Sequence, residues 1–481
     1  MVDLNIMRQT LMPEQVLEPG SAEYEKAVFI GNLNYRFTTP AAVIRAKSTN
    51  DVVSTVVDFA RVNGIRLTVK NGGHSYMGYC LNRGGIVLDL SLMNTCHIDY
   101  DKMLIHMDSG LVWKDVYYKY LKDKRNIVIG GQCPTVGVSG FTLGVGLSPF
   151  SRKNYGLRCD NLLEMTIVTW DGQVVTVSRE DKDAEKQELF WALAGGGGGN
   201  FGVTVGLKSR MHKLRDQEGK WPSELTIDAL WIHDKNKQLI GGMTVIYNGG
   251  LKKAQEVLEP LLEFKPFKND SKVYHHHASF IFAEGAITPE VTAKISNLVE
   301  EATRVVGITD NNEVNDPKCH ILWDHIGAET EQIASDETPF PWRKGHYVST
   351  LKVQWADETK QNDMEFVCKC KAELLPYAID KKAAYINYID ATVADWQEAY
   401  YGQNYRRLQK PLESEEDQAL PPNGNTTDPN NDDPPPVKVD KWWKECTPLV
   451  TPGDLESLKT NQEVFERDVV LREHVMKSMF Q

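Results

Sequence analysis

The sequence lacks several features that define common protein classes. Its 481 residues contain no apolar run of the roughly 18 residues that a transmembrane helix needs. Lys and Arg total 54 against 66 Asp and Glu, a net charge of −12, so the basic excess typical of proteins that bind nucleic acid or anionic membranes is absent. The eight cysteines include no C-x-x-C pair, which argues against a zinc ribbon. We therefore expect a small-molecule substrate, with no nucleic-acid or membrane partner and no metal site.

The amino terminus, MVDLNIMRQTLMPEQ, lacks the basic start and apolar stretch of a secretory signal. We expect a secreted protein whose signal has been removed, with the cytoplasm as the alternative. Hydrophobic residues make up 41% and charged residues 25%, which is typical of a globular chain. We expect it to be a monomer.

Residues 40–70 predict a β-α-β unit. A strand is expected at 41–46, and a helix follows that begins near Ser48, because small polar residues cap helices. Gly64 is expected to end that helix in a left-handed conformation, and 65–70 predicts the second strand. The Val- and Ile-rich stretch 84–94 predicts a further pair of strands.

Three glycine-rich segments stand out. The first follows the β-α-β unit and reads VKNGGHSYMGY, the second is GGQCPTVGVSGFTLGVG at 130–146, and the third is ELFWALAGGGGGNFGVTV. Glycine lets a backbone approach a ligand closely or adopt positive φ. The five consecutive glycines at 195–199 precede a β-branched strand, so we interpret them as a cradle for a diphosphate, with a surface hinge as the alternative.

Glycine becomes rarer after residue 213, where strands and helices alternate. Strands are expected at 225–231, 273–282, 347–355 and 384–389, and helices at 250–263, 288–305 and 361–376. The segment 411–438 is rich in Pro, Asn and Asp and predicts a flexible loop, and 453–480 resumes a helical pattern.

The three glycine segments, together with TPFPWR at 338–343, YINYID at 385–390 and AYYGQNYRRL at 399–408, resemble the berberine-bridge-enzyme-like branch of the vanillyl-alcohol-oxidase flavoprotein family. The resemblance implies an α+β fold with two domains: an FAD-binding domain and an α/β substrate domain built on an antiparallel sheet. It implies domain ranges of 1–212 and 213–390, with 391–481 returning to the FAD domain.

The resemblance also implies the cofactor and its attachment. His74 would bond the flavin 8α carbon and Cys133 would bond flavin C6, giving a bicovalent FAD. Val136, three residues after the cysteine, governs oxygen access in the family, and its modest size implies O₂ as electron acceptor. The other expected cofactor-binding residues are Asn71, Gly72, Gly73, Ser75, Gly137, Gly140, Gly144, Gly198, Gly199, Asn200, Gly202, Val203 and Asn404.

Hydride removal from a C–OH or C–N carbon needs a base for the departing proton. Tyr400 stands where the family places an active-site tyrosine, and we rank it first, ahead of Asp395, Tyr347 and Asp390. The alternative for Tyr400 is a core aromatic that only packs. On the strand of Tyr347, alternate residues such as Leu351 should face the same way.

Two departures from the family pattern concern the glycine segment at 130–146 and the chain end. Ser139 and Val145 stand where glycines are expected, and an acidic, Pro-rich stretch follows Arg407. The three neighbouring histidines at 275–277 could suggest a metal site. Neighbouring residues in a strand point to opposite faces, however, so we expect a half-exposed strand there and no metal site.

The leading functional hypothesis is an oxidase that takes a hydride from an alcohol or hemiacetal carbon, such as that of an oligosaccharide, and reduces O₂ to H₂O₂. The alternatives are oxidation or oxidative cyclisation of a secondary metabolite such as an alkaloid, and a non-redox cyclase on the same fold. A binding protein without redox activity is a fourth reading.

Overall fold

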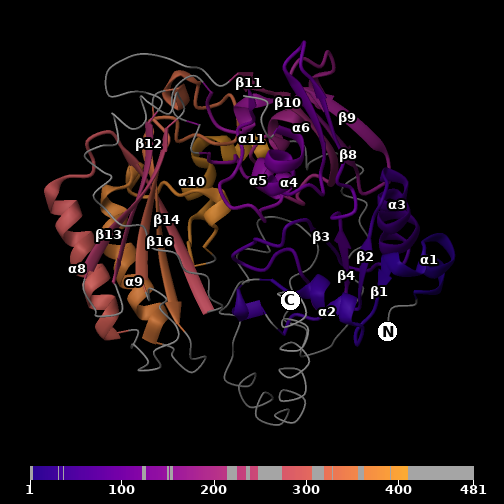
Figure 1. Ribbon diagram of the computed structural model, residues 1–481, viewed down its shortest axis with the longest axis horizontal. Coiled ribbons are helices and arrows are strands. Elements are labelled where there is room, and N and C mark those ends of the chain that lie inside the picture. The colour runs from indigo at the N-terminus through magenta and orange to yellow at the C-terminus, as the bar shows by residue number, and fades with distance from the viewer. Residues whose placement is uncertain are drawn as a thin grey trace, which may run out of the picture.

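The computed structural model arranges the chain around three main sheets (Figure 1). It describes residues 4–30, 32–35, 37–121, 126–148, 151, 155–213, 225–233, 239–247, 274–305, 319–327, 329–355, 362–390 and 392–409. The predicted segments 250–263, 411–438 and 453–480 lie outside these residues.

The first sheet contains the predicted β-α-β unit. Its order is β1 (Val16–Leu17), β2 (Ala42–Arg45), β4 (Ile86–Asp89) and β3 (Leu67–Lys70), and β4 pairs in parallel with both β2 and β3. The Ser48 side chain caps α3 (Thr49–Val53) by accepting the Asp51 N–H, and η3 (Ser54–Arg61) continues the helix. Gly64 has φ +62°, as expected of a residue that ends a helix. The pair of strands expected at 84–94 is wrong, since the described part forms only β4 there.

The second sheet is antiparallel. Its order is β5 (Cys96–Asp99), β6 (Leu104–Asp108), β10 (Val203–Arg210), β8 (Leu162–Val168) and β9 (Val174–Ser178). The short helices α4 (Trp113–Asp115) and α5 (Val138–Leu143), with the longer α6 (Ala184–Leu193), pack with this sheet. β10 follows the glycine run, so the sheet fixes the end of that run in space.

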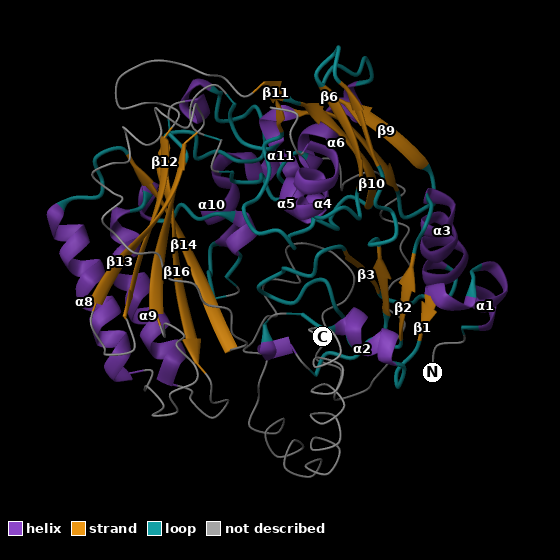
Figure 2. Cartoon of the chain, viewed as in Figure 1, coloured by secondary structure: helices purple, strands orange, loops and turns teal. Residues whose placement is uncertain are grey.

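The third sheet is antiparallel and belongs to the second half of the chain. Its order is β13 (Leu239–Tyr247), β12 (Leu225–His233), β15 (Cys319–His325), β16 (Gly345–Trp355) and β14 (Tyr274–Ala283). Helices α8 (Pro289–Val305) and α9 (Asn362–Leu374), both predicted, cover its outer face (Figure 2). The strand expected at 384–389 is wrong, because that segment contains the 3₁₀ turn η10 (Ile386–Tyr388).

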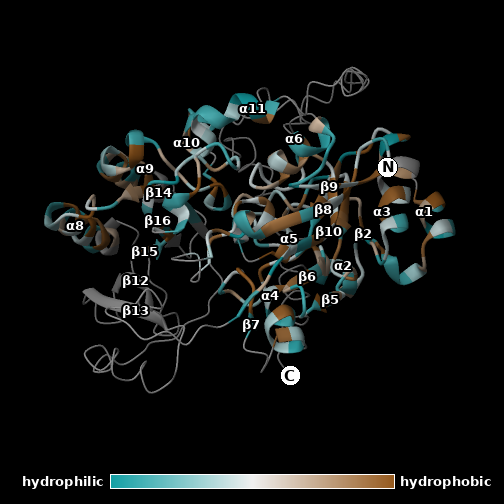
Figure 3. Cartoon of the chain, turned by 90° about the horizontal axis from the view of Figure 1, so that it is seen from above, coloured by the Kyte–Doolittle hydropathy of each residue, from teal (hydrophilic) through white to brown (hydrophobic). Residues whose placement is uncertain are grey.

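Alternation along the strands gives this third sheet two different faces. Phe280, Leu351 and Val353 pack with α8 and α9 in one core cluster. Ile281 and Val348 instead belong to the core of the first half of the chain. The inner face of the sheet therefore looks onto the glycine segments. Hydrophobic colour gathers around β8, β10 and α5 in Figure 3, whereas α8 carries much of the hydrophilic colour.

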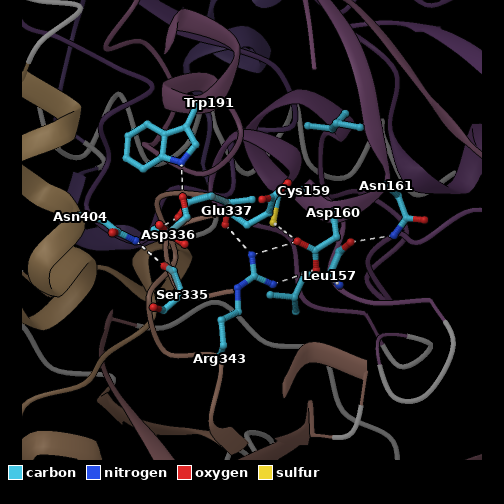
Figure 4. Close-up of polar contacts among 12 residues, drawn as sticks. Leu157, Cys159, Asp160, Asn161, Trp191, Ser335, Asp336, Glu337, Arg343 and Asn404 are labelled. Atoms are coloured by element: carbon cyan, nitrogen blue, oxygen red, sulfur yellow. Dashed lines mark hydrogen bonds and ion pairs between the residues drawn. The ribbon is translucent and has the colours of Figure 1, made fainter. Parts of the chain in front are cut away.

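Residues 335–343, which we call the strap, join the two halves (Figure 4). Arg343 makes a buried bidentate ion pair with Asp160, at 2.9 Å for both N···O contacts. Trp191 Nε1 donates to the Asp336 carbonyl at 2.8 Å. The strap is thus anchored to the first half of the chain by this buried ion pair, by the more exposed Arg179–Glu337 pair and by backbone acceptors.

The carboxyl-terminal helices α10 (Trp396–Tyr401) and α11 (Tyr405–Gln409), with η11 (Gly402–Asn404), pack against the strap as well. None of the helices in the described ranges is long and apolar enough to cross a bilayer. Within those ranges every cysteine is a free thiol, and no group of three or more His, Cys, Asp or Glu side chains could hold a metal ion.

Candidate active site

The first two glycine segments meet backbone to backbone. A Cβ on Gly72 would lie 2.5 Å from Gly137 N and 2.6 Å from Thr135 O, and a Cβ on Gly137 would lie 2.5 Å from Asn71 Nδ2. Asn71 Nδ2 donates to the Ser109 and Leu111 carbonyls at 2.5 and 3.1 Å. Only glycine permits this approach, and the contact brings two segments that are distant in sequence together.

His74 and Cys133 come together at this junction. His74 Nε2 lies 2.9 Å from Thr135 Oγ1, and the same oxygen lies 3.6 Å from Cys133 Sγ. Both side chains are exposed to solvent. Surrounding protein atoms and, secondarily, the charge of Lys70 lower the pKa of His74. At neutral pH the imidazole is therefore neutral and nucleophilic.

The third segment joins the same site through α5. Gly197 N donates to the Leu143 carbonyl at 2.9 Å, and Asn200 Nδ2 donates to the Gly196 carbonyl at 2.8 Å. A Cβ on Gly140 or Gly199 would meet no protein atom within 4 Å. These exposed backbone positions suit close approach by a cofactor, so the residues present fit FAD.

We expect Gly72→Ala to disturb this site strongly. The three nearest atoms that the new Cβ would meet are all backbone atoms of Thr135 and Gly137, so the two loops must move apart. Overpacking of this kind costs about 1–3 kcal/mol of unfolding free energy, and flavin content should fall with it. Thermal melting and the flavin-to-protein absorbance ratio measure both effects.

Gly140→Ala is the matched control, because its Cβ enters open space and its φ is not positive. Its melting temperature in the flavin-free state should equal that of the wild type. Equal melting temperatures for Gly72→Ala and Gly140→Ala would contradict the importance of the Gly72–Gly137 contact.

The two departures from the expected glycines have different structural outcomes. Ser139 is buried, and its hydroxyl accepts a hydrogen bond from Asn71 Nδ2 at 3.1 Å. Val145 has φ +76°, a conformation that glycine favours and that strains a β-branched residue. The backbone there keeps the glycine-like geometry despite the valine, and Ser139 adds a contact that glycine lacks.

The inner face of the third sheet supplies a second group of polar side chains. The Tyr76 ring stacks on His277 of β14, with centroids 3.6 Å apart, and on Tyr388, with centroids 5.6 Å apart. Tyr388 Oη donates to Asp324 Oδ2 of β15 at 3.5 Å. Burial, followed by the negative charge of Asp324, raises the pKa of Tyr76 far above its usual value. Tyr76 therefore connects the segment that carries His74 to the third sheet.

The sequence interpretation missed this group. Tyr388 lies in YINYID, a motif of the family resemblance, but nothing in that motif distinguishes Tyr388 from its neighbours as a catalytic residue. Asp324 lies on a strand that was not predicted. Its orientation follows from the register, in which Asp324 faces Val348, a residue of the inner face.

Two of the predicted catalytic residues lie in buried structural networks. Tyr400 is 1% exposed, and its oxygen accepts the Asp390 N–H at 2.8 Å. Burial and the charge of Asp390 raise the pKa of Tyr400, so the phenol is a poor base. Asp390 itself pairs with His276 at 3.1 Å and Lys371 at 2.6 Å. Burial alone would raise the pKa of Asp390, but His276 and Lys371 hold it well below its usual value.

The other two predicted bases have different surroundings. Tyr347 packs with the α8–α9 face of the sheet, together with Leu351 as predicted, and its ring contacts His325 and His346. Asp395 is exposed at the start of α10. The geometry favours none of the four predicted bases. Tyr388, which stacks on Tyr76 close to His74 in the chain, and its partner Asp324 are further candidates.

Asn404 was expected to contact the flavin, but it is buried under the strap. Its Nδ2 donates to the Ser335 and Thr338 carbonyls at 2.6 and 3.1 Å. A side chain whose amide is committed to two backbone acceptors has a structural role here, so the structure does not support a flavin contact for Asn404.

The remaining predicted cofactor residues fall into two groups. Gly73 and Ser75 lie beside His74, with Ser75 Oγ accepting the Tyr79 N–H at 3.1 Å, and Gly198 is exposed beside Gly199. Val136 packs partly buried against the main core. Others are packed against protein: Gly144 against Asn387, Gly202 against the Val168 carbonyl, and Val203 in the core.

The histidines of β14 serve separate contacts, as alternation requires. His276 pairs with Asp390, and His277 stacks on Tyr76 from the opposite face. They do not form a joint site.

Comparison with known proteins agrees with these motifs. The model of the FAD binding domain family matches residues 40–178, and the model described as berberine and berberine like matches residues 384–410. Tetrahydroberberine oxidase of Berberis wilsoniae is 24% identical over 432 residues, covering 74% of this chain and 79% of that protein. The (R)-6-hydroxynicotine oxidase of Paenarthrobacter nicotinovorans is 38% identical over 175 residues, which are 36% of each chain.

Solved structures show the same fold. Berberine bridge enzyme from Eschscholzia californica superimposes with a TM-score of 0.71 at 19% identity, covering 85% of this chain and 95% of that one. The Bermuda grass isoallergen BG60 also gives a TM-score of 0.71 at 19% identity, covering 87% and 98% of the two chains. The likeness therefore extends well beyond the two matched segments.

Proposed function

Because the chain belongs to the berberine-bridge-enzyme-like FAD-linked oxidoreductases, we propose that it is an oxidase carrying FAD on both His74 and Cys133. The observation that carries the proposal is the shared Thr135 hydroxyl, 2.9 Å from His74 Nε2 and 3.6 Å from Cys133 Sγ. Two potential attachment residues from separate loops are thereby held at one place. FAD, when bound, supplies the hydride acceptor.

The proposed substrate is an alcohol or a hemiacetal, such as the reducing end of an oligosaccharide. Tyr388 takes the hydroxyl proton of the substrate and passes its own to Asp324, whose Oδ2 lies 3.5 Å away. Contacts of this length commonly shorten when substrate binds. Tyr76 stacks on both His277 and Tyr388, and these contacts hold the Tyr388 ring in place.

The proposed electron acceptor is O₂, which is reduced to H₂O₂. Support comes from the modest size of Val136, three residues after Cys133, in the position that governs oxygen access in the family.

An alkaloid or another amine is the second candidate substrate. Asp324 offers a carboxylate to a protonated amine, and two of the relatives are named as oxidases of tetrahydroberberine and hydroxynicotine. Peroxide release from a panel of saccharides and cyclic amines, measured on one preparation, separates the two candidates.

Denaturing intact-mass analysis tests the attachment. The wild type, His74→Ala and Cys133→Ala should each be heavier than the bare chain by one FAD, and the double variant should have the bare mass. A wild type of bare mass would refute covalent attachment, and loss of FAD in either single variant would reduce the proposal to one bond.

A further inference from the structure

We propose that Thr135 is a positioning residue for covalent attachment, because it orients His74 so that imidazole Nδ1 is the attacking nitrogen. The inference rests on the proposed function, in which His74 carries FAD. A neutral imidazole has one N–H donor and one lone-pair nitrogen. When the Nε2–H donates to Thr135 Oγ1 across 2.9 Å, the lone pair is on Nδ1. The Thr135 hydroxyl hydrogen is then free to point to Cys133 Sγ at 3.6 Å.

The Thr135 backbone is held firmly enough to impose this orientation. Its carbonyl oxygen is one of the atoms that a Gly72 Cβ would meet, at 2.6 Å, so the threonine lies directly against the first glycine-rich segment, which carries His74. On either side, the Pro134 carbonyl accepts the Lys114 N–H at 2.9 Å and the Val136 carbonyl accepts the Trp113 N–H at 3.1 Å. These two hydrogen bonds tie the backbone on both sides of Thr135 to α4, so Thr135 keeps its place against the segment that carries His74.

The hydrogen bond from His74 to the Thr135 hydroxyl becomes stronger during attachment. As Nδ1 forms its bond, positive charge develops on the ring and strengthens the Nε2–H···O hydrogen bond. The charge of Lys70 works against that positive charge, since Lys70 Nζ would lie 3.8 Å from a Cβ on Gly73, the residue before His74. Asp89 offsets Lys70 only partly, at 3.5 Å. Thr135, on the segment that carries Cys133, supplies the acceptor that stabilises the positive charge on the His74 ring.

The chemistry balances with dioxygen as oxidant. A bond forms between Nδ1 and the 8α carbon, and one C–H bond of that carbon breaks. The imidazole gives up its Nε2 proton and the carbon gives up its hydrogen as a proton. The electron pair of the broken C–H bond passes through the ring system to dioxygen, which leaves as H₂O₂ with the two protons.

The test measures attachment rates and does not depend on enzyme turnover. Flavin-free protein is incubated with FAD, and the covalent fraction is followed by denaturing intact mass. In a Cys133→Ala background, where only His74 can attach, Thr135→Val should slow attachment about tenfold, the value of one hydrogen bond of about 1.4 kcal/mol. Thr135→Ser keeps the hydroxyl and should attach at nearly the rate of the background protein.

The matched control uses the His74→Ala background, where only Cys133 can attach. Thr135→Val should change that rate less than twofold, because the sulfur contact is longer and weaker. Equal slowing in both backgrounds, or failure of Thr135→Ser to rescue, would indicate a general loop defect and overturn the inference. An unchanged rate for Thr135→Val in the Cys133→Ala background would also overturn it while leaving the proposed attachment intact. A wild type without covalent FAD would refute both.

Discussion

Tyr388→Phe is expected to lower kcat by about 10²–10⁴-fold, the usual contribution of a positioned acid or base. The substitution keeps the ring that stacks near Tyr76 but removes the hydroxyl that takes the proton of the substrate and relays to Asp324. Flavin content and melting temperature should change little. Stopped-flow reduction of the bound flavin by substrate measures the step directly, without interference from reoxidation.

Tyr400→Phe provides the contrasting variant. Its hydroxyl accepts the buried Asp390 N–H, so its loss should lower the unfolding free energy by about 1–3 kcal/mol while reduction by substrate keeps its rate. If Tyr400→Phe abolished reduction and Tyr388→Phe did not, the ranking derived from the motif would be right and the one derived from the geometry wrong. Asp324→Asn should resemble Tyr388→Phe.

The largest loss of stability is expected from Arg343→Met. The guanidinium is 3% exposed and binds both oxygens of Asp160, and burial alone would lower the pKa of Arg343 while the charge of Asp160 raises it. Removing the arginine leaves a buried carboxylate with no positively charged partner, which keeps the Leu157 N–H at 2.8 Å and the weak Cys159 thiol donor at 3.6 Å. The expected cost is about 3–5 kcal/mol of unfolding free energy, measured by denaturant titration.

Arg179→Met is the matched control, because Arg179 forms an ion pair with the same strap from outside it. Arg179 pairs with Glu337 at 2.7 Å, but the Glu337 side chain is 51% exposed. Exposed pairs contribute at most about 1 kcal/mol, so the two variants should differ clearly. A double variant, Arg343→Met with Asp160→Asn, should recover part of the lost stability, because no unpaired charge remains. Similar losses from Arg343→Met and Arg179→Met would contradict a special role for the buried ion pair.

Local chemistry made part of the fold predictable. The helix that begins after Ser48 and ends at Gly64, the parallel strands around it, and the later helices α8 and α9 follow from capping residues, glycine and periodicity. The 384–389 segment was predicted incorrectly, because an apolar run of six residues does not distinguish a strand from the irregular η10 segment.

For the site, the sequence by itself identified the chemical groups. The histidine, the cysteine and the glycines that need space were recognisable because each is defined by its immediate neighbours in the chain. The sequence did not identify which side chains face them. Tyr400, Asp390 and Asn404 are near the site in the motifs, yet burial and ion pairing give them structural roles. Asp324 and Tyr388 meet only because strand register and the packing of one sheet face bring together residues 64 positions apart. Such contacts depend on the arrangement of the whole chain, and for this reason only the tertiary structure determined them.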